Sequence, residues 1–396
     1  MPVSRRRLLF VIFVTTVTGI TSNTLIGPAI PNILDEFGAS DASAGLIVAA
    51  GSMPGIVVAP FVGFIADRRG RREVLVPCLV LFGVAGGLAG LAPNLASLVG
   101  LRMLQGVGSA GLINLAIVVI GDNFSGGERA RMIGRNSAVL TACLALFPLL
   151  GGLITAQFGW RAVFAVYPVA VGTAALVQVT LPRFRGNADG SQTRLADVLP
   201  IIRRPEFTAV LGGTVLVFGL IFGALLTLMP VHLERTFGVD EATRGLLLGL
   251  PALGALSGSL ATGSLSARYG RRRVAMLAAP LFTVALLTMA AADSLAVLVA
   301  AVTLFGLGEG LAIPLMQDIA ASAGGPAQRG TLVATQVGMS RFGQTVGPLA
   351  LSPLSGAVGR PTTFGIAAIV AALPLGALLW RATPPAPRPA EPTVRA

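Results

Sequence analysis

Twelve long apolar stretches alternate along this chain with short polar or arginine-bearing connections. In the first half, the apolar stretches lie near residues 8–28, 44–64, 74–92, 97–120, 135–156 and 162–181. In the second half, they lie near residues 208–230, 244–265, 274–292, 295–319, 332–355 and 362–380. About 20 mostly apolar residues are enough for a helix to cross a bilayer. The pattern therefore predicts an all-α membrane protein with twelve transmembrane helices.

A segment between the second and third apolar stretches returns 200 positions later. Residues Gly63 to Arg72 read GFIADRRGRR, and residues Gly263 to Arg272 read GSLSARYGRR. The same offset pairs other residues of the two halves, among them Gly45 with Gly245, Gly106 with Gly306, Arg129 with Arg329 and Pro148 with Pro348. A parallel repeat of two six-helix halves is a recognised transporter design, with the binding site between the halves. The repeat predicts two pseudo-symmetric six-helix bundles.

The repeat and the local composition divide the chain into four parts. The predicted N-terminal bundle covers residues 1–181, and the predicted C-terminal bundle covers residues 208–381. Residues 182–207 are polar and arginine-rich, and we expect a cytoplasmic linker there, with a short amphipathic helix near residues 195–202 on the membrane surface. Residues 382–396 are rich in proline, and we expect a disordered cytoplasmic tail.

Composition excludes a soluble domain. Hydrophobic residues make up 54% of the chain, charged residues 12%, and the mean hydropathy is +0.81. A soluble globular domain carries about 25% charged residues. The lipid bilayer is therefore the expected surroundings of most of the chain.

The arginines predict the orientation of the helices. Most of them fall in connections on one side: Arg5 to Arg7, the two repeated loops, Arg129, Arg131, Arg183, Arg185, Arg194, Arg203, Arg204, Arg329, Arg388 and Arg395. The opposite side has only Arg161, Arg235, Arg244 and Arg360 in its connections. By the positive-inside rule, both termini lie in the cytoplasm, as expected for the inner membrane of a bacterium. The net charge of +12 then reflects topology and contact with anionic lipid, and no nucleic acid is expected as a partner.

The sequence offers little material for catalysis. It contains no G-x-S-x-G, H-E-x-x-H or P-loop motif, and His232 is its single histidine. Cys78 and Cys143 both fall in predicted spans, and neither has a second ligand near it, so they are expected to be buried apolar residues. We therefore expect no enzyme, no cofactor and no metal site, and transport must draw its energy from an ion gradient or from the gradient of the substrate.

The first copy of the repeated segment is similar to the best-known signature of the major facilitator superfamily, G-x-L-a-D-R-x-G-R-K, with Ile65 and Arg72 at two departures from it. The resemblance covers nearly the whole chain and is closest to the twelve-helix drug:proton antiporter group. It implies a conformational lock made by Gly63, Asp67, Arg68, Gly70 and Arg71, in which the glycine packs helices closely and Asp67 braces a helix terminus of the other half. The alternative is that Asp67 only caps the next helix.

The predicted fourth helix carries a second match to the family, R-x-x-Q-G-x-G, from Arg102 to Gly108. Arg102, Gln105 and Ser109 share one helix face, and an arginine facing lipid is costly, so this face is expected to line the cavity. The alternative is that Arg102 extends to the outer interface. The candidate cavity residues are Thr18, Ser22, Asn23, Gln105, Ser109, Asn114, Glu309 and Gln344.

The predicted fifth and eleventh helices each carry part of the family's antiporter signature, G-x-x-x-G-P-x-x-G-G. The fifth keeps Pro148, Gly151 and Gly152 but has Cys143 and Phe147 in place of the first two glycines. The eleventh keeps Gly343, Gly347 and Pro348 without the final glycine pair. These six residues are candidates for hinge and packing positions, because proline interrupts helical hydrogen bonds and glycine allows close approach.

Glu309 is the clearest carboxylate deep in a predicted span, and Arg341 falls at a similar depth on the next helix. A carboxyl group away from water favours its neutral form, whereas a nearby guanidinium favours the charged form. Three roles stay open for Glu309: reversible proton binding, a permanent ion pair with Arg341, or direct contact with substrate. Arg341 and Arg102 are further candidates for proton coupling.

The sequence thus predicts a secondary transporter that works by alternating access, most simply a monomeric, proton-coupled exporter of small amphipathic compounds. With Arg102 and Arg341 against Glu309, the cavity suits neutral or anionic substrates. A sugar or metabolite carrier of the same fold, with import as one possible direction, is the alternative within transport. A membrane receptor that has lost transport is the alternative from another class.

Overall fold

The computed structural model describes residues 5–181, 195–325 and 328–383, and nearly all of them are helical. The N-terminal bundle consists of α1 (Arg5–Thr24), η1 (Gly27–Ala29), α2 (Ile30–Glu36), η2 (Asp41–Ser43), α3 (Ala44–Ser52), α4 (Pro54–Arg69), α5 (Arg71–Ala89), α6 (Leu95–Ser109), α7 (Leu112–Asn123), α8 (Gly126–Phe158), α9 (Trp160–Phe164) and α10 (Val169–Thr180). The C-terminal bundle consists of α12 (Pro205–Leu220), η3 (Ile221–Leu228), α13 (Met229–Phe237), α14 (Glu241–Gly249), α15 (Pro251–Tyr269), α16 (Arg271–Ala291), α17 (Leu295–Ser322), α18 (Arg329–Val358), α19 (Arg360–Val370), η4 (Ala371–Leu375) and α20 (Gly376–Ala382).

Each of the predicted spans falls on one continuous or briefly interrupted helical segment. In the described part of the chain, 11 segments are long and apolar enough to cross a membrane. The further long helix is α18, with 30 residues, whose serine, threonine, glutamine, glycine and proline content lowers its hydropathy. Several helices extend beyond the predicted ends. For example, α8 begins at Gly126, because the polar residues after it continue the helix beyond the apolar stretch.

Prolines interrupt two spans that appear continuous in the hydropathy pattern. Pro54 is the first residue of α4, and Pro251 is the first residue of α15. Proline has no backbone N–H and fits best in the first turn of a helix. Each of these spans is therefore built from two consecutive helices, α3 and α4 in one bundle and α14 and α15 in the other.

The repeated loops turn at glycines that have a left-handed backbone conformation. Gly70 joins α4 to α5 with φ of 100°, and Gly270 joins α15 to α16 with φ of 84°. Residues with a side chain rarely adopt such angles. The glycine of the repeated R-x-G-R pattern therefore serves the same turn in both halves.

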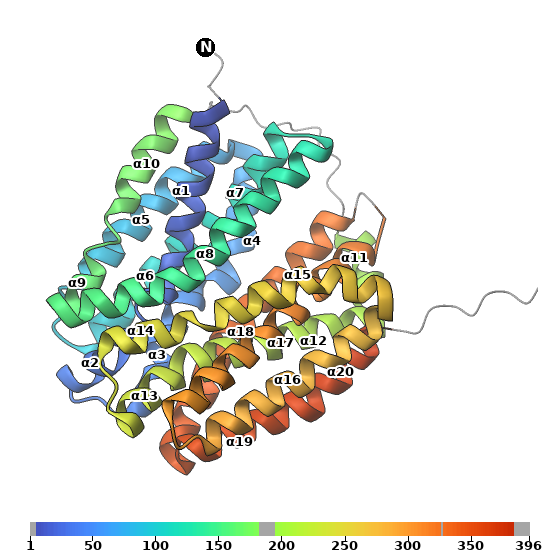
Figure 1. Ribbon diagram of the computed structural model, residues 1–396. Helices are drawn as coiled ribbons and strands as arrows, with labels where there is room; N and C mark the ends of the chain where they lie inside the picture. Colours follow the sequence, from blue (N-terminus) through green and yellow to red (C-terminus); the bar gives the residue numbers. More distant parts are fainter. Residues whose placement is uncertain (1–4, 182–194, 326–327, 384–396) are drawn as a thin grey trace, which may run out of the picture.

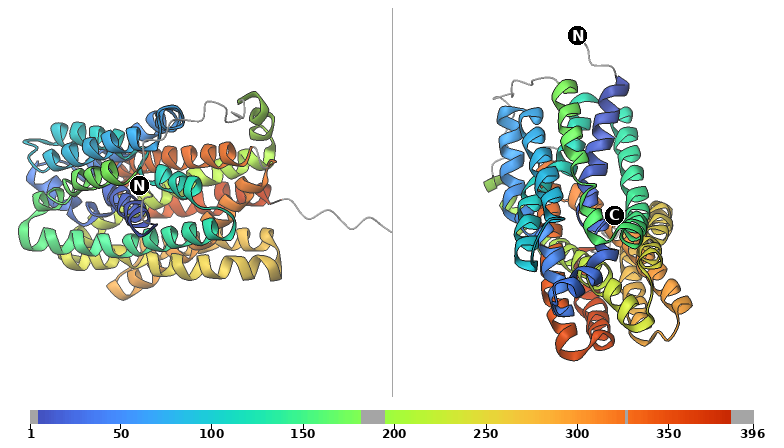
Figure 2. Two further views of the ribbon diagram at one scale, coloured as in Figure 1. Left: turned by 90° about the horizontal axis from the view of Figure 1, so that it is seen from above. Right: turned by 90° about the vertical axis from the view of Figure 1, so that its left-hand side faces the viewer.

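The buried apolar residues form two clusters, one in each bundle. Figure 1 shows the N-terminal bundle, coloured from blue to green, leaning against the C-terminal bundle, coloured from yellow to red. The bundles meet where α8 lies along α14 and where α3 lies along α18. Figure 2 shows the two bundles from two other directions.

In the sequence, α11 (Leu195–Ile202) lies between the helices of the two bundles, at the position of the predicted linker helix. Val198 and Ile201 are buried in the apolar cluster of the C-terminal bundle, and Ile201 lies beside Gly324. This helix therefore packs on the protein rather than only on the membrane surface. Residues 182–194 of the predicted linker and most of the predicted tail lie outside the described residues.

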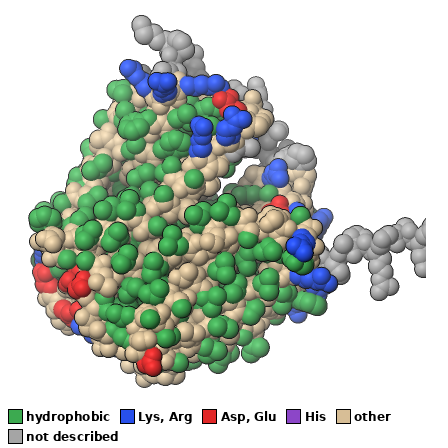
Figure 3. Space-filling model, viewed as in Figure 1, with side chains coloured by type: hydrophobic (Ala, Val, Ile, Leu, Met, Phe, Trp, Pro, Cys, Tyr) green, Lys and Arg blue, Asp and Glu red, His purple; other side chains and the backbone are tan. Residues whose placement is uncertain are grey.

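Charge separates the two ends of the molecule (Figure 3). One end carries Arg5 to Arg7 and the arginines of both repeated loops, and we call it the arginine-rich end. The other end carries seven carboxylates, and we call it the acidic end: Asp35, Glu36, Asp41, Glu234, Asp240, Glu241 and Asp293. Figure 3 also shows a hollow between the two bundles that opens toward the arginine-rich end.

Candidate functional site

The two bundles are tied together at the acidic end by ion pairs. Arg235 of α13 forms a two-pronged pair with Asp35 of α2, with Nη1 3.2 Å from Oδ2 and a second contact between Nη2 and Oδ1. The Nε of Arg235 lies 3.4 Å from Asp41 Oδ1, and Nη1 of Arg360 lies 2.9 Å from Asp41 Oδ2. We call these four residues the acidic-end latch.

A second polar contact lies beside the latch. Arg244, only 1% exposed, donates from Nη2 to Asn32 Oδ1 of the other bundle at 2.7 Å. Asn32 in turn donates to Glu241 Oε1 at 2.7 Å, and Glu234 Oε2 lies 3.1 Å from Arg244 Nη1. The buried guanidinium is thus neutralised by carboxylates of its own bundle and held by an amide of the other.

The helix that carries Arg244 begins with a side-chain cap. Asp240 Oδ1 accepts the backbone N–H of Thr243 at 2.9 Å, and Oδ2 accepts the Thr243 hydroxyl at 3.0 Å. These hydrogen bonds lower the pKa of Asp240, because they stabilise its charged form. The cap fixes the start of α14, where it meets α8.

These residues were missed as functional candidates. Sequence reasoning treated Arg235, Arg244 and Arg360 only as exceptions to the charge bias. The usable signal was the opposite charge of the connections: Asp35 and Asp41 flank the first connection, whereas these three arginines lie in connections of the second half. Arg161, the fourth exception, pairs with Glu36 inside its own bundle at 2.7 Å.

Glycines allow the helices of the two bundles to cross in close contact. A Cβ atom on Gly45 would lie 2.3 Å from the carbonyl oxygen of Pro348, and one on Gly245 would lie 2.4 Å from the carbonyl oxygen of Pro148. Both crossings therefore exclude a side chain at the glycine. The 200-residue offset matches Gly45 with Gly245 and Pro148 with Pro348. In each crossing, the glycine of one half meets the proline of the other half.

Other predicted packing residues serve contacts on either side of these crossings. Gly152 lies against the carbonyl oxygen of Glu241 in the other bundle, where a Cβ atom would approach to 2.2 Å. Gly151 packs on Leu25, Gly343 on Val215, and Gly347 on Gly219, each within one bundle. Ser352 reinforces the crossing of α3 and α18, because its Oγ accepts the N–H of Gly45 at 3.0 Å.

The predicted lock lies at the arginine-rich end and makes its described contacts within the N-terminal bundle. Arg71 pairs with Asp67, and its Nε lies 3.1 Å from Asp122 Oδ2. Arg68 stacks over Phe64, with its Cζ 4.1 Å from the ring centroid. A side chain on Gly63 would meet nothing within 4 Å, so the close packing expected at this glycine does not occur in this arrangement of the bundles.

Arg102 is fully buried and joins helices of the N-terminal bundle. Its Nη1 donates to the carbonyl oxygen of Ser22 and to Gln105 Oε1, both at 2.7 Å, and its Nη2 donates to Asn23 Oδ1. Asn23 also donates to Ser52 Oγ at 3.0 Å. The guanidinium therefore neither extends to the interface nor lines an open cavity, and within the described residues its hydrogen-bond acceptors are neutral.

The remaining cavity candidates of this bundle differ in exposure. Thr18 and Ser109 are buried and donate to backbone carbonyls of their own helices, Val14 at 2.8 Å and Gly106 at 3.0 Å. Asn114 is half-buried, and within the described residues its side chain makes no hydrogen bond. Of these three, Asn114 has the side chain most free to meet a ligand.

Glu309 and Arg341 lie on α17 and α18, and both are half-buried. Met316, seven residues after Glu309 on the same helix face, contacts Thr214 of α12 with its sulfur 3.7 Å from the hydroxyl. This face of α17 is therefore turned toward the inside of the bundle. Within the described residues, Glu309 makes no hydrogen bond or ion pair, and no pair joins it to Arg341.

Arg341 reaches the interface between the bundles. Its Nη1 donates to Gln344 Oε1 at 3.3 Å, and its Cδ lies 3.6 Å from the Cβ position of Gly55 on α4. Buried polar atoms without a partner occur on Arg102, Gln105 and Ser22, but none of the described ones belongs to Glu309 or Arg341. The free polar atoms of Glu309 and Arg341 are therefore not fully enclosed by protein, in contrast to those around Arg102.

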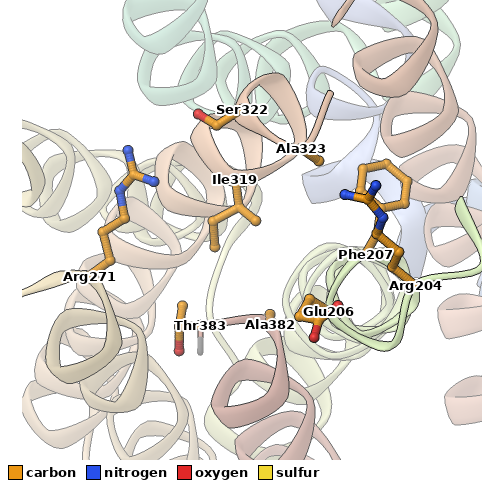
Figure 4. A pocket seen from close by; sticks show the side chains of 9 residues that line it. All are labelled: Arg204, Glu206, Phe207, Arg271, Ile319, Ser322, Ala323, Ala382 and Thr383. Carbon is orange, nitrogen blue, oxygen red and sulfur yellow. The ribbon is translucent and has the colours of Figure 1, made fainter. Parts of the chain in front are cut away.

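A depression of about 420 Å³ lies at the arginine-rich end of the C-terminal bundle (Figure 4). Arg204 and Arg271 reach it from the starts of α12 and α16. Arg271 also pairs with Asp318 at 2.8 Å, and Glu206 lines the same depression, so positive and negative charges nearly balance there. It belongs to one bundle and adds no residue to the space between the two. In the described part of the chain, no group of three His, Cys, Asp or Glu could hold a metal ion.

Comparison with known proteins gives consistent matches. A model of the Major Facilitator Superfamily matches residues 12–240 and 211–396. The bacillibactin exporter of Bacillus subtilis is 26% identical over 341 residues, which cover 82% of this chain and 84% of that protein. The multidrug transporter protein MdtP of Bacillus subtilis is 32% identical over 202 residues, which cover 50% of this chain and 35% of that protein.

Solved structures match over nearly the whole length. A bacterial homologue of the human lysosomal transporter Spinster, in an inward-facing and unoccupied conformation, has a TM-score of 0.78 at 18% identity, covering 96% of this chain and 97% of that one. The nucleoside transporter NupG has a TM-score of 0.76 at 13% identity, covering 95% of this chain and 98% of that one. At these identities, the likeness concerns the fold.

Proposed function

This chain belongs to the Major Facilitator Superfamily, and we propose that it is a proton-coupled exporter of small amphipathic compounds in which Glu309 binds the coupling proton. It is a multi-pass membrane transporter whose relatives include proteins named as a bacillibactin exporter and a multidrug transporter. Those names support export as the direction of transport.

The observation that carries the proposal is the position of Glu309 and its lack of an ion-pair partner within the described residues. Its carboxyl group lies on the inner face of α17, it has no ion-pair partner within the described residues, and its oxygens are not fully enclosed by protein. A carboxyl group in such surroundings can change its protonation state without breaking a salt bridge. Arg341 is close enough in depth to favour proton release when it approaches, and Arg102 is too enclosed to take part directly.

The positive-inside rule supports an orientation with the arginine-rich end in the cytoplasm of a bacterium and the acidic end outside. In this orientation the structure is open to the cytoplasm and closed outside. Glu309 then releases its proton to the cytoplasm while substrate enters. When the bundles separate at the acidic end instead, an external proton binds Glu309 and substrate leaves.

The test uses purified protein in proteoliposomes with an imposed pH gradient and a trapped pH-sensitive dye, pyranine. Amphipathic dyes are added one at a time, and both dye movement and proton movement are recorded. Glu309→Gln should abolish uphill transport and the coupled proton flux, while dye exchange down its own gradient continues. Glu206→Gln, an exposed acid of the same bundle, is the matched control and should behave as wild type. Uphill transport by Glu309→Gln at the wild-type rate would rule out the proton role.

The same assay separates the other functions. A sugar or metabolite importer would move sugars or other metabolites inward and leave the amphipathic dyes untouched. A receptor without transport would move none of these compounds. Neither alternative is favoured by a described contact.

A further inference from the structure

Arg341 is a cation at the interface of the two bundles that has no acidic partner there. Its one described side-chain hydrogen bond goes to a neutral group, Gln344 Oε1, at the long distance of 3.3 Å. No carboxylate of the described residues lies within ion-pair distance of it, Glu309 included. Arg102, by comparison, is enclosed by acceptors at 2.7 Å.

The surroundings of Arg341 direct it toward the space between the bundles. Its stem lies against Gly55 of the opposite bundle, with Cγ, Cδ and Nε all within 3.9 Å of the Cβ position. Val57 of α4 and Met53 just before this helix lie on the face opposite Gly55 and are 63% and 44% exposed. Gly55 therefore faces inward, and the arginine stem lies at van der Waals distance from its Cβ position.

A guanidinium without a counter-ion is costly in a membrane-spanning segment. Arginine offers five N–H donors in a planar fork that matches a carboxylate, a phenolate or a phosphate. Because Gln344 uses its oxygen to accept from Arg341, its amide N–H₂ group remains a donor on the same side. Together the two residues form a donor set to which a neutral acceptor adds hydrogen bonds only, whereas an anion adds both hydrogen bonds and the missing negative charge.

We propose that Arg341 and Gln344 bind the anionic group of the transported substrate, which is therefore an amphipathic organic anion. This inference rests on the proposed transport function and specifies its substrate class. The offset by 200 residues places Thr141 opposite Arg341, so the pseudo-symmetric position in the other half lacks the charge. The anionic group is bound on one side of the substrate space only.

The experiment measures equilibrium binding to the purified full chain by calorimetry, in the absence of any ion gradient. The probes are 1-naphthoate and 1-naphthamide, which share an apolar body and differ in charge. Wild type should bind the carboxylate on the order of tenfold more tightly than the amide, as expected for a charge-assisted hydrogen-bond pair. Arg341→Gln should reduce this ratio to about one, and Arg341→Lys should restore part of it, because a lysine keeps the charge but loses the fork.

Arg131→Gln, which removes an exposed arginine of α8, is the control and should keep the wild-type ratio. Folding of every variant is checked by its unfolding temperature, and Gln344→Leu is a second variant that should lower the ratio without removing a charge. Equal binding of the two probes by wild type, binding of neither, or an unchanged ratio in folded Arg341→Gln would each overturn the proposal. Because binding is measured without a gradient, a failure of proton coupling leaves this result unaffected, and the two proposals can fail separately.

Discussion

Gly245 of α14 lies against the carbonyl oxygen of Pro148 of α8, so closely that a Cβ atom would approach that oxygen to 2.4 Å. Pro148 is one of the positions at which the hydrogen-bond ladder of a helix is interrupted, because proline lacks the N–H. The crossing thus combines a helix that can bend with a helix that has no side chain at the contact. The same combination recurs where Gly45 meets Pro348.

Gly245→Val should therefore force α8 and α14 apart. Overpacking costs about 1–3 kcal/mol, and this cost falls on the packing of α14 against α8. We expect a lower unfolding temperature and a transport rate that falls by roughly five- to 150-fold. Gly172→Ala is the control, because nothing lies within 4 Å of its Cβ position. If both variants keep wild-type stability and transport, the crossing does not require glycine.

Asp41→Asn should weaken the acidic-end latch, because Asp41 pairs with both Arg235 and Arg360. Glu36→Gln removes a similar charge at the same end, but its partner Arg161 belongs to the same bundle. An impermeant thiol reagent applied at the acidic end should label a cysteine placed at Ser352 faster in Asp41→Asn than in wild type. Equal labelling in the two variants would show that the latch does not hold the bundles together.

Asp67→Asn should lower transport with little effect on stability. The Asp67 side chain is 64% exposed and pairs only inside its bundle, and such exposed ion pairs contribute about 0–1 kcal/mol. A role as a lock can therefore act only in a different arrangement of the bundles. Asp122→Asn, which removes the other partner of Arg71, should leave transport nearly unchanged. Equal transport losses in the two variants would favour a local role for both acids.

Arg102→Gln should lower the free energy of unfolding more than Arg341→Gln does. Removing Arg102 leaves buried acceptors without donors, at a cost of about 1–3 kcal/mol or more in the free energy of unfolding. Arg341 has open polar atoms and one long hydrogen bond, so its loss should cost less than about 1 kcal/mol. Chemical denaturation of both variants in detergent checks the order, and the reverse order would contradict the structural account.

Asp240→Ala should destabilise α14 by about 1 kcal/mol, the usual cost of losing an N-terminal cap. Asp240→Asn keeps an acceptor oxygen and should lose less. The pKa of Asp240 is lower in the folded state, so its charge adds stability above the ordinary pKa of about 3.9, and this stability is lost as the pH falls. Unfolding temperatures measured between pH 3 and pH 7 should therefore converge for wild type and Asp240→Asn at low pH.

Much of the fold could be predicted from residues that act locally. Apolar length identified the spans, and the glycines of the repeated loops marked turns that only glycine adopts readily, as the φ angles of Gly70 and Gly270 bear out. The offset also matched Gly45 with Gly245 and Pro148 with Pro348, but it could not show that each glycine meets the proline of the other half. That contact depends on how two independently packed bundles dock.

The candidate site was less predictable for a related reason. Arg102 and Arg341 both appear as single arginines in apolar stretches, yet one is enclosed and the other open. The difference arises from neighbours distant in sequence: Ser22 and Asn23 cover Arg102, whereas Gly55 leaves room beside Arg341. Likewise, Arg244 and Asn32 pair over more than 200 residues, which no local pattern reveals.

The two glycine and proline crossings also constrain how the bundles can move. Two points of contact define a line, and a rigid body held at two points keeps only one rotation, about the axis through them. Turning about this axis would leave Gly45 and Gly245 in place while the arginine-rich ends of the two bundles approach each other. The two crossings would then define the rotation axis between the bundles, and this axis would be set by uncharged glycine and proline residues.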